Sequence, residues 1–207
     1  MYRIITIILL AAASLAAKAQ TAREVLDATA KRLTNSGVRA TFTATQFNGT
    51  TPQSETSGTM LMKGRKFHIS TDEMLAWYDG KKQWSMLTNS TEANLTEPTE
   101  EELAQTNPAA LIGIYKRGYD AKLSTSTLRG KATYVVHLKA TSTAAEFSEI
   151  YIDIERATYT PLCIRAKHDD DWLRLAIMSF ATDQKTKASD FEFPEKQYPN
   201  VDIIDLR

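Results

Sequence analysis

The sequence predicts a mainly β protein of the α+β class, in which helices cover one long, curled antiparallel sheet. Three observations support this fold class. The hydrophobic period is helical over residues 21–37, is two over most of residues 38–180, and becomes helical again only in an insertion over residues 99–118. We count about eleven strand candidates, with "DFEF" at residues 190–193 as a weak twelfth. A sheet of this length is expected to curl, and its apolar face needs a cover.

The first 19 residues are expected to be a cleaved export signal. Arg3 gives a positive start, residues 4–17 form an apolar run, and Ala17-Lys18-Ala19 has the small-x-small pattern of a cleavage site. The run is short for a bilayer span, which favours a signal over a retained anchor. Cys163 is the one cysteine of the chain, so none follows the predicted cut to carry a lipid. Residues 20–207 are therefore expected to form a single, soluble, exported domain.

A helix is predicted over residues 21–37, at the start of this domain. Thr21 and Glu24 have the spacing of a capping box, and Gly37 suits the C-terminal stop. One face of the helix is predicted to pack on the sheet. That face comprises Ala22, Leu26, Thr29 and Leu33.

The meander that follows contains the hairpin "LAWYDGKKQWSM" at residues 75–86. Its aromatic residues either fill an ordinary core or line a pocket. A two-residue turn at Asp79-Gly80 would place Leu75 opposite Trp84 and put Trp77 on the same face, with both indoles pointing inward. A turn with a bulge at Gly80 would send the two tryptophans to opposite faces.

The insertion is predicted to be two short helices. Thr99 and Glu102 form a second possible capping box, and Asn107-Pro108 is typical of a helix start. The apolar stripe of the second helix is Leu111, Ile112 and Tyr115, with Ile114 beside it. Three helices are a thin cover for so long a sheet, which indicates an apolar concavity.

Composition and motifs argue against several classes of function. The chain has 25 basic and 25 acidic residues, which offers no clustered charge to nucleic acid. No nucleophile elbow, phosphate loop or zinc motif is present, so we expect no enzyme, metal or cofactor. His68 and His137 lie on predicted strands without a second ligand nearby, and "HDDD" from His168 is interpreted as a solvated hairpin turn. Cys163 is interpreted as a packed side chain.

The order of these stretches resembles the LolA-like periplasmic carriers of lipoproteins. The matching stretches are "VRATFTATQ", "SGTMLMK" for the Gly-x-Leu-x-x-Lys strand, "YDGKKQW" for the Asp-Gly-Lys-x-x-Trp hairpin, "NPAALI" and "FEFP". The resemblance implies an open half-barrel with a helical lid and a cavity for lipoprotein acyl chains. It implies an inner-membrane ABC-type release complex and an outer-membrane acceptor as partners, a periplasmic location and a monomer. The ending "IIDLR" resembles the divergent branch of Bacteroidetes.

The resemblance also implies site residues. In the family an arginine followed by proline latches the lid; here "KGRKF" has Gly64 at that position and no proline, so Arg65 is the candidate if the register shifts by one. The predicted acyl-chain-binding residues are Phe42, Met60, Met62, Phe67, Ile69, Leu75, Trp77, Trp84, Met86, Leu111, Ile112, Tyr115, Tyr134, Val136, Leu138, Ile150, Ile152 and Ile154. Two alternatives stay open: a carrier or sensor of another lipid or glycolipid, and a structural domain with a solid core.

Overall fold

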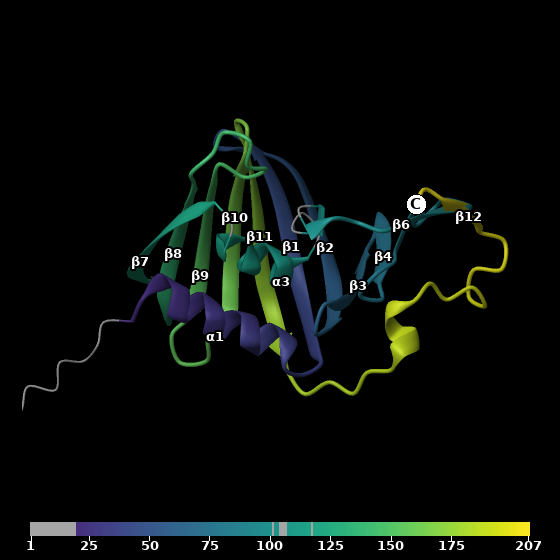
Figure 1. Cartoon of the computed structure of the whole chain (residues 1–207), viewed down its shortest axis with the longest axis horizontal. Helices are drawn as coiled ribbons and strands as arrows, with labels where there is room; N and C mark the ends of the chain where they lie inside the picture. Colours follow the sequence, from purple (N-terminus) through teal and green to yellow (C-terminus); the bar gives the residue numbers. More distant parts are fainter. Residues whose placement is uncertain (1–19, 101, 104–106, 117) are drawn as a thin grey trace, which may run out of the picture.

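The described residues form one curled, open sheet of twelve strands with helices on its concave face (Figure 1). The computed structural model describes residues 20–100, 102–103, 107–116 and 118–207, so the predicted export signal lies outside the described residues. The strand order is β12-β6-β5-β4-β3-β2-β1-β11-β10-β9-β8-β7, which leaves β12 and β7 as the two edges. The predicted fold class is confirmed, and the sheet does not close into a barrel.

The strands form two antiparallel meanders, β1 to β6 and β7 to β11, which are joined by the antiparallel pairing of β1 with β11. They are β1 (Val38–Asn48), β2 (Thr51–Lys63), β3 (Lys66–Thr71), β4 (Met74–Tyr78), β5 (Gln83–Leu87), β6 (Glu92–Thr96), β7 (Tyr119–Leu128), β8 (Lys131–Ala140), β9 (Glu149–Glu155), β10 (Pro161–His168), β11 (Asp171–Ala181) and β12 (Asp202–Asp205).

The twelfth strand is not the one predicted. The "DFEF" stretch lies at the end of a 3-10 helix, η2 (Ala188–Phe191), and β12 instead forms near the C-terminus, parallel to β6. Phe191 and Phe193 are both buried. Their spacing of two residues is the same as the period of a strand, which is why the sequence predicted a strand here.

Helix α1 (Ala22–Thr34) begins with the predicted capping box. The Glu24 amide donates to the Thr21 hydroxyl, and the Thr21 amide donates to the Glu24 carboxylate. The whole predicted inner face is buried, with Val25 added to it. The helix ends at Thr34, so Gly37 is not its cap; Gly37 lies instead against the backbone of Gln184.

The insertion contributes α3 (Pro108–Gly113) and η1 (Ile114–Lys116), and its first predicted helix falls partly outside the described residues. The predicted bonds of its capping box are present, because the Glu102 amide donates to the Thr99 hydroxyl and the Thr99 amide donates to the Glu102 carboxylate. None of the helices in the described part of the chain is long and apolar enough to cross a membrane.

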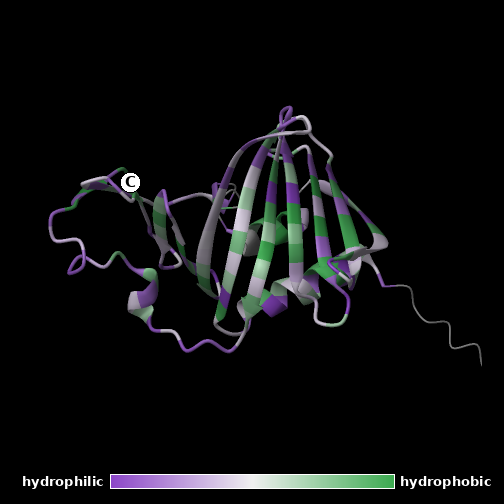
Figure 2. Ribbon diagram, turned by 180° about the vertical axis from the view of Figure 1, so that it is seen from behind, coloured by the Kyte–Doolittle hydropathy of each residue, from purple (hydrophilic) through white to green (hydrophobic). Residues whose placement is uncertain are grey.

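The main hydrophobic core lies between the concave face of the sheet, α1 and α3. Val25, Leu26 and Ile112 from the helices meet Ile152 and Leu138 of the sheet, and all are almost completely buried. Figure 2 shows the alternation of hydrophobic and hydrophilic residues along the long strands that produces this one-sided core.

A second, smaller core lies on the other face of the sheet. Leu75, Trp77, Met86, Ala93 and Phe193 form it, and Trp84, Tyr198 and Val201 pack against it. The polypeptide after β11 passes around the sheet and reaches β12 beside β6, so this C-terminal segment (residues 182–201) is the cover (Figure 1).

The hairpin between β4 and β5 adopts neither predicted register. Trp77 pairs with Trp84 and Tyr78 with Gln83. The loop spans residues 79–82, where the Asp79 carboxylate accepts hydrogen bonds from the Lys81 amide at 2.8 Å and the Lys82 amide at 2.7 Å. The two indoles share a face, as one alternative predicted, because an even shift of the register preserves the side of the sheet.

Candidate functional site

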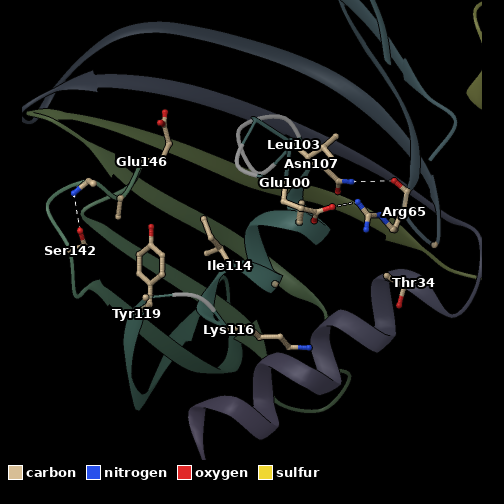
Figure 3. A pocket seen from close by; sticks show the side chains of 16 residues that line it. Thr34, Arg65, Glu100, Leu103, Asn107, Ile114, Lys116, Tyr119, Ser142 and Glu146 are labelled. Carbon is tan, nitrogen blue, oxygen red and sulfur yellow. Dashed lines mark hydrogen bonds and ion pairs between the residues drawn. The ribbon is translucent and has the colours of Figure 1, made fainter. Parts of the chain in front are cut away.

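A pocket of about 510 Å³ opens at one end of the concave face, between the insertion and the sheet. The insertion, the turn between β2 and β3, the end of α1 and the loop between β8 and β9 all contribute to its wall (Figure 3). This volume is within the range of small-molecule sites.

Apolar side chains form the inner wall of the pocket. Leu103, Ala110 and Ile114 come from the insertion, Tyr119 from the start of β7, and Ala145 from the loop between β8 and β9. The Tyr119 hydroxyl donates a hydrogen bond to the Phe147 carbonyl at 2.8 Å, and burial raises the pKa of Tyr119. The hydroxyl is therefore a fixed donor, and the ring remains available as an apolar surface.

Polar groups lie at the rim. The Arg65 guanidinium, in the turn between β2 and β3, donates to the carboxylate of Glu100 and forms an ion pair with it (Figure 3). This hydrogen bond raises the pKa of Arg65. The Asn107 side-chain amide donates to the Arg65 carbonyl at 3.4 Å. One turn of the sheet thus contacts the insertion at two points.

The other side of the insertion contacts α1. The Tyr115 hydroxyl donates to the Asp27 carboxylate at 2.7 Å, and Lys116 Nζ lies 3.6 Å from the same carboxylate. Burial, followed by the contact with Asp27, raises the pKa of Tyr115 to about 12. The insertion is therefore attached to the rest of the fold by its buried apolar stripe and by a few polar contacts near its surface.

Most of the predicted acyl-chain-binding residues lie together on the concave side. They belong to the core between the sheet and the helices, where they pack against neighbouring side chains, and they do not line the open pocket. Arg65 is the predicted site residue that does line it. The residues in this concave core are Phe42, Met60, Met62, Phe67, Ile69, Leu111, Ile112, Tyr115, Tyr134, Val136, Leu138, Ile150, Ile152 and Ile154.

The predicted hairpin residues lie elsewhere. Leu75, Trp77, Trp84 and Met86 belong to the second core, under the C-terminal segment, which corrects the expectation that both indoles point into the concavity. The physical reason is that β4 is apolar on both faces. Ala76 and Tyr78 occupy the concave side, and the larger Trp77 is buried on the other side.

The side chains that the sequence offered as candidates for catalysis or metal binding lie in ordinary structural environments. Burial raises the pKa of the Cys163 thiol, which disfavours the nucleophilic thiolate. His137 Nε2 lies 3.2 Å from the Glu149 carboxylate, and its ring stacks on Tyr151. His168 is the last residue of β10, directly before the turn to β11. In the part of the chain that the structure describes, no group of three metal-ligating side chains converges.

Comparison with known proteins agrees with this geometry. Residues 12–170 match the family model of the outer membrane lipoprotein carrier protein LolA. The chain belongs to this family. The resemblance seen in the sequence is thereby confirmed. In this LolA-family chain Arg65 forms an ion pair with Glu100, a residue of the insertion. No curated protein sequence is significantly similar to the chain.

Solved structures are similar to the chain at low sequence identity, and the first of the two described here shares its fold. An uncharacterised conserved protein from Thermus thermophilus is 14% identical with a TM-score of 0.63, over 90% of this chain and 99% of that one. A LolA superfamily protein from Nitrosomonas europaea is 9% identical with a TM-score of 0.48, over 84% and 99%.

Several pocket residues of this LolA-family chain were not predicted from sequence. Ala144 and Ala145 lie in a loop, where no hydrophobic period exists to indicate a face. Ala110 lies in α3, which is only six residues long, and Tyr119 is the first residue of β7. Ile114 did carry a signal, because it is apolar and lies off the buried stripe of its helix. In the structure Ile114 packs against the main core and lines the pocket.

Proposed function

We propose that this protein is a soluble periplasmic carrier that shields the acyl chains of lipoproteins and delivers them from the inner to the outer membrane. Membership of the LolA family supports the carrier role. The single observation that supports this role for the present protein is the apolar-walled pocket between the sheet and the insertion. The proposed partners are an inner-membrane ABC-type release complex as donor and an outer-membrane acceptor, with the protein acting as a monomer.

The insertion serves as the lid in this proposal. The pocket admits the end of an acyl chain, and displacement of α3 would remove Leu111 and Ile112 from the core that they share with Met60, Met62 and Ile69. A chain of about sixteen carbons forfeits about 0.8 kcal/mol per methylene in water, or roughly 12 kcal/mol in all. A concave face rich in Ile, Leu and Met offsets that cost by burial alone, and the soft methionines adapt to differing chains.

Filling the pocket provides the test. We expect the fold to tolerate Ala144→Trp, because Ala144 is exposed at the pocket wall. We also expect the indole to weaken binding of a palmitoylated peptide by about tenfold or more, since it occupies the volume that the chain needs. Fluorescence anisotropy of a labelled palmitoyl peptide, titrated with residues 20–207, measures the affinity.

A matched control separates pocket filling from added surface hydrophobicity. Ala157→Trp places the same side chain in the exposed turn between β9 and β10, away from the pocket, and should leave the affinity unchanged. Failure of the unmodified protein to bind the palmitoyl peptide, or equal weakening by both substitutions, would reject the proposed carrier function.

The Arg65–Glu100 pair is the proposed latch of the lid. Both side chains are well exposed, at 60% and 42%, so solvent screens the pair and its contribution is at most about 1 kcal/mol. Arg65→Ala should therefore accelerate amide exchange in α3 by up to about fivefold without lowering the global stability noticeably. Hydrogen exchange read by mass spectrometry measures this effect.

Lys81→Ala is the control for the latch. Lys81 forms an equally exposed ion pair with Glu97, at 3.4 Å, outside the pocket, and its loss should not alter exchange in α3. Equal exchange rates in the two variants would show that Arg65 does not hold the lid.

A second candidate is a carrier or sensor of another lipid or glycolipid on the same half-barrel. The exposed polar groups that line the pocket, including Lys116 and Ser142, favour a ligand with a polar head at the mouth. Mass spectrometry of lipids extracted from protein purified from its native cells distinguishes lipoprotein from glycolipid cargo.

A further inference from the structure

A second pocket, of about 680 Å³, lies on the face of the sheet opposite the lid. Its floor is the outward face of β1 to β4, and its other wall is the C-terminal segment. The residues of the floor alternate along each strand with residues of the main core, so the two pockets are separated by the thickness of the sheet. The proposed carrier function makes no use of this second pocket.

One row of paired residues crosses the floor. Arg39 pairs with Leu61, Leu61 with His68, and His68 with Trp77. The His68 ring stacks on the Trp77 indole, with the ring centroids 5.1 Å apart and the planes 15° apart. The row thus places an arginine two strands away from an imidazole whose ring is stacked on an indole.

The wall formed by the C-terminal segment adds charge. Lys185 and Lys187 line the pocket, and Asp190 is its one described carboxylate. The Asp190 carboxylate already accepts a hydrogen bond from the Lys187 amide at 2.7 Å. Arg39, Lys185 and Lys187 together leave the described lining with an excess of positive charge, in a chain whose basic and acidic residues are equal in number.

Unlike several cations elsewhere in the described fold, these three have no carboxylate partner. Arg65, Lys131 and Arg165 are each paired with a carboxylate. Among the described residues, Arg39, Lys185 and Lys187 form no such ion pair. They come from two segments that are far apart in sequence, and the fold brings them to the same pocket. Cations held in one pocket repel each other, so an anion placed between them would be stabilised by all of them.

The other lining groups suit an anion rather than an acyl chain. Thr59, Ser70 and Ser189 bring hydroxyl donors to the pocket. Burial, followed by the charge of Arg39, lowers the pKa of His68, while Asp190 acts in the opposite direction. His68 Nε2 is buried without a hydrogen-bond partner in the described structure. The pocket therefore combines positive potential with hydroxyl donors.

We propose that this pocket binds a phosphate group, which would bridge Arg39 of the sheet and the lysines of the C-terminal segment. Phosphate suits the site because its oxygens accept charge-assisted hydrogen bonds from several directions at once. The phosphate belongs either to a small soluble molecule or to a lipid headgroup. Its binding would also hold the C-terminal segment against the sheet.

Calorimetric titration of residues 20–207 in a low-salt buffer free of phosphate tests the soluble source, with inorganic phosphate and glycerol 3-phosphate as the probes. Flotation with vesicles of phosphatidylglycerol in phosphatidylcholine, against phosphatidylcholine alone, tests the lipid source. Arg39→Ala and Lys187→Ala, on opposite walls of the pocket, should each weaken binding by about tenfold, as expected for loss of a charge-assisted hydrogen bond.

Lys122→Ala removes an exposed cation from β7, at the far edge of the sheet, and should leave binding unchanged. Binding of either soluble phosphate, or of the anionic vesicles alone, supports the site and identifies the source, provided that Arg39→Ala or Lys187→Ala weakens it. Absence of binding to all probes, or an equal loss in the Lys122 variant, overturns the proposal. Neither outcome bears on the binding of palmitoyl peptide, which tests the proposed carrier function separately.

Discussion

We expect Trp77→Ala to lower the free energy of unfolding by about 3 to 5 kcal/mol, as for other large aromatic residues removed from a core. Trp77 is 3% exposed, and it is the residue on which the second core is built. Its indole meets Phe193 edge-on at 5.4 Å and Tyr198 at 6.1 Å between ring centroids. Both partners belong to the C-terminal segment, so the cavity left by the substitution would detach that segment first.

Two measurements check this expectation. Urea unfolding followed by circular dichroism gives the loss of stability, and limited proteolysis should release peptides from residues 182–207 sooner than in the unmodified protein. Trp172→Ala is the control, because Trp172 is only partly buried and meets Tyr151 at 6.0 Å on the outer surface. If the two substitutions cost the same free energy, the second core does not hold the C-terminal segment.

The elements that could be predicted from sequence are those whose signals are local. In helix α1 the two residues of the capping box are three positions apart, and the residues of the buried face all lie within four turns. Both features are observed. Strands β8 and β9 carry apolar residues at every second position of one face, and Val136, Leu138 and Ile152 on that face are all completely buried. Periodicity reports which face of an element is apolar, and a single buried face is enough to place such an element.

The candidate site was harder to predict because it depends on contacts between distant segments. In β4, four consecutive residues are buried, so both faces of the strand are apolar and the sequence pattern does not indicate which face is turned toward the lid. The cover on the outer side is Phe193, more than a hundred positions away in the chain. The open pocket is likewise assembled from separate segments of the chain, and Ala145 and Arg65 come to line the same pocket only through the tertiary fold. Such positions carry no periodic signal of their own.

Gly37→Ala is expected to lower the free energy of unfolding by about 3 kcal/mol, the upper part of the range for forced overpacking. The Gly37 carbonyl accepts a hydrogen bond from the Gln184 amide at 2.9 Å. A methyl group at Gly37 would lie 2.1 Å from the Gln184 carbonyl oxygen, a backbone atom that no side-chain rotation can move. The substitution therefore separates the start of β1 from the start of the C-terminal segment and breaks this bond.

Gly113→Ala is expected to change the free energy of unfolding in the opposite direction. Gly113 ends α3, and a methyl group there would meet no atom within 4 Å. Because alanine favours the helix over glycine, α3 should gain up to about 1 kcal/mol. Thermal unfolding should therefore shift downward in the Gly37 variant and upward or not at all in the Gly113 variant. A downward shift of equal size in both would mean that the loss comes from replacing glycine in general, and the close approach of Gly37 to Gln184 would not be its cause.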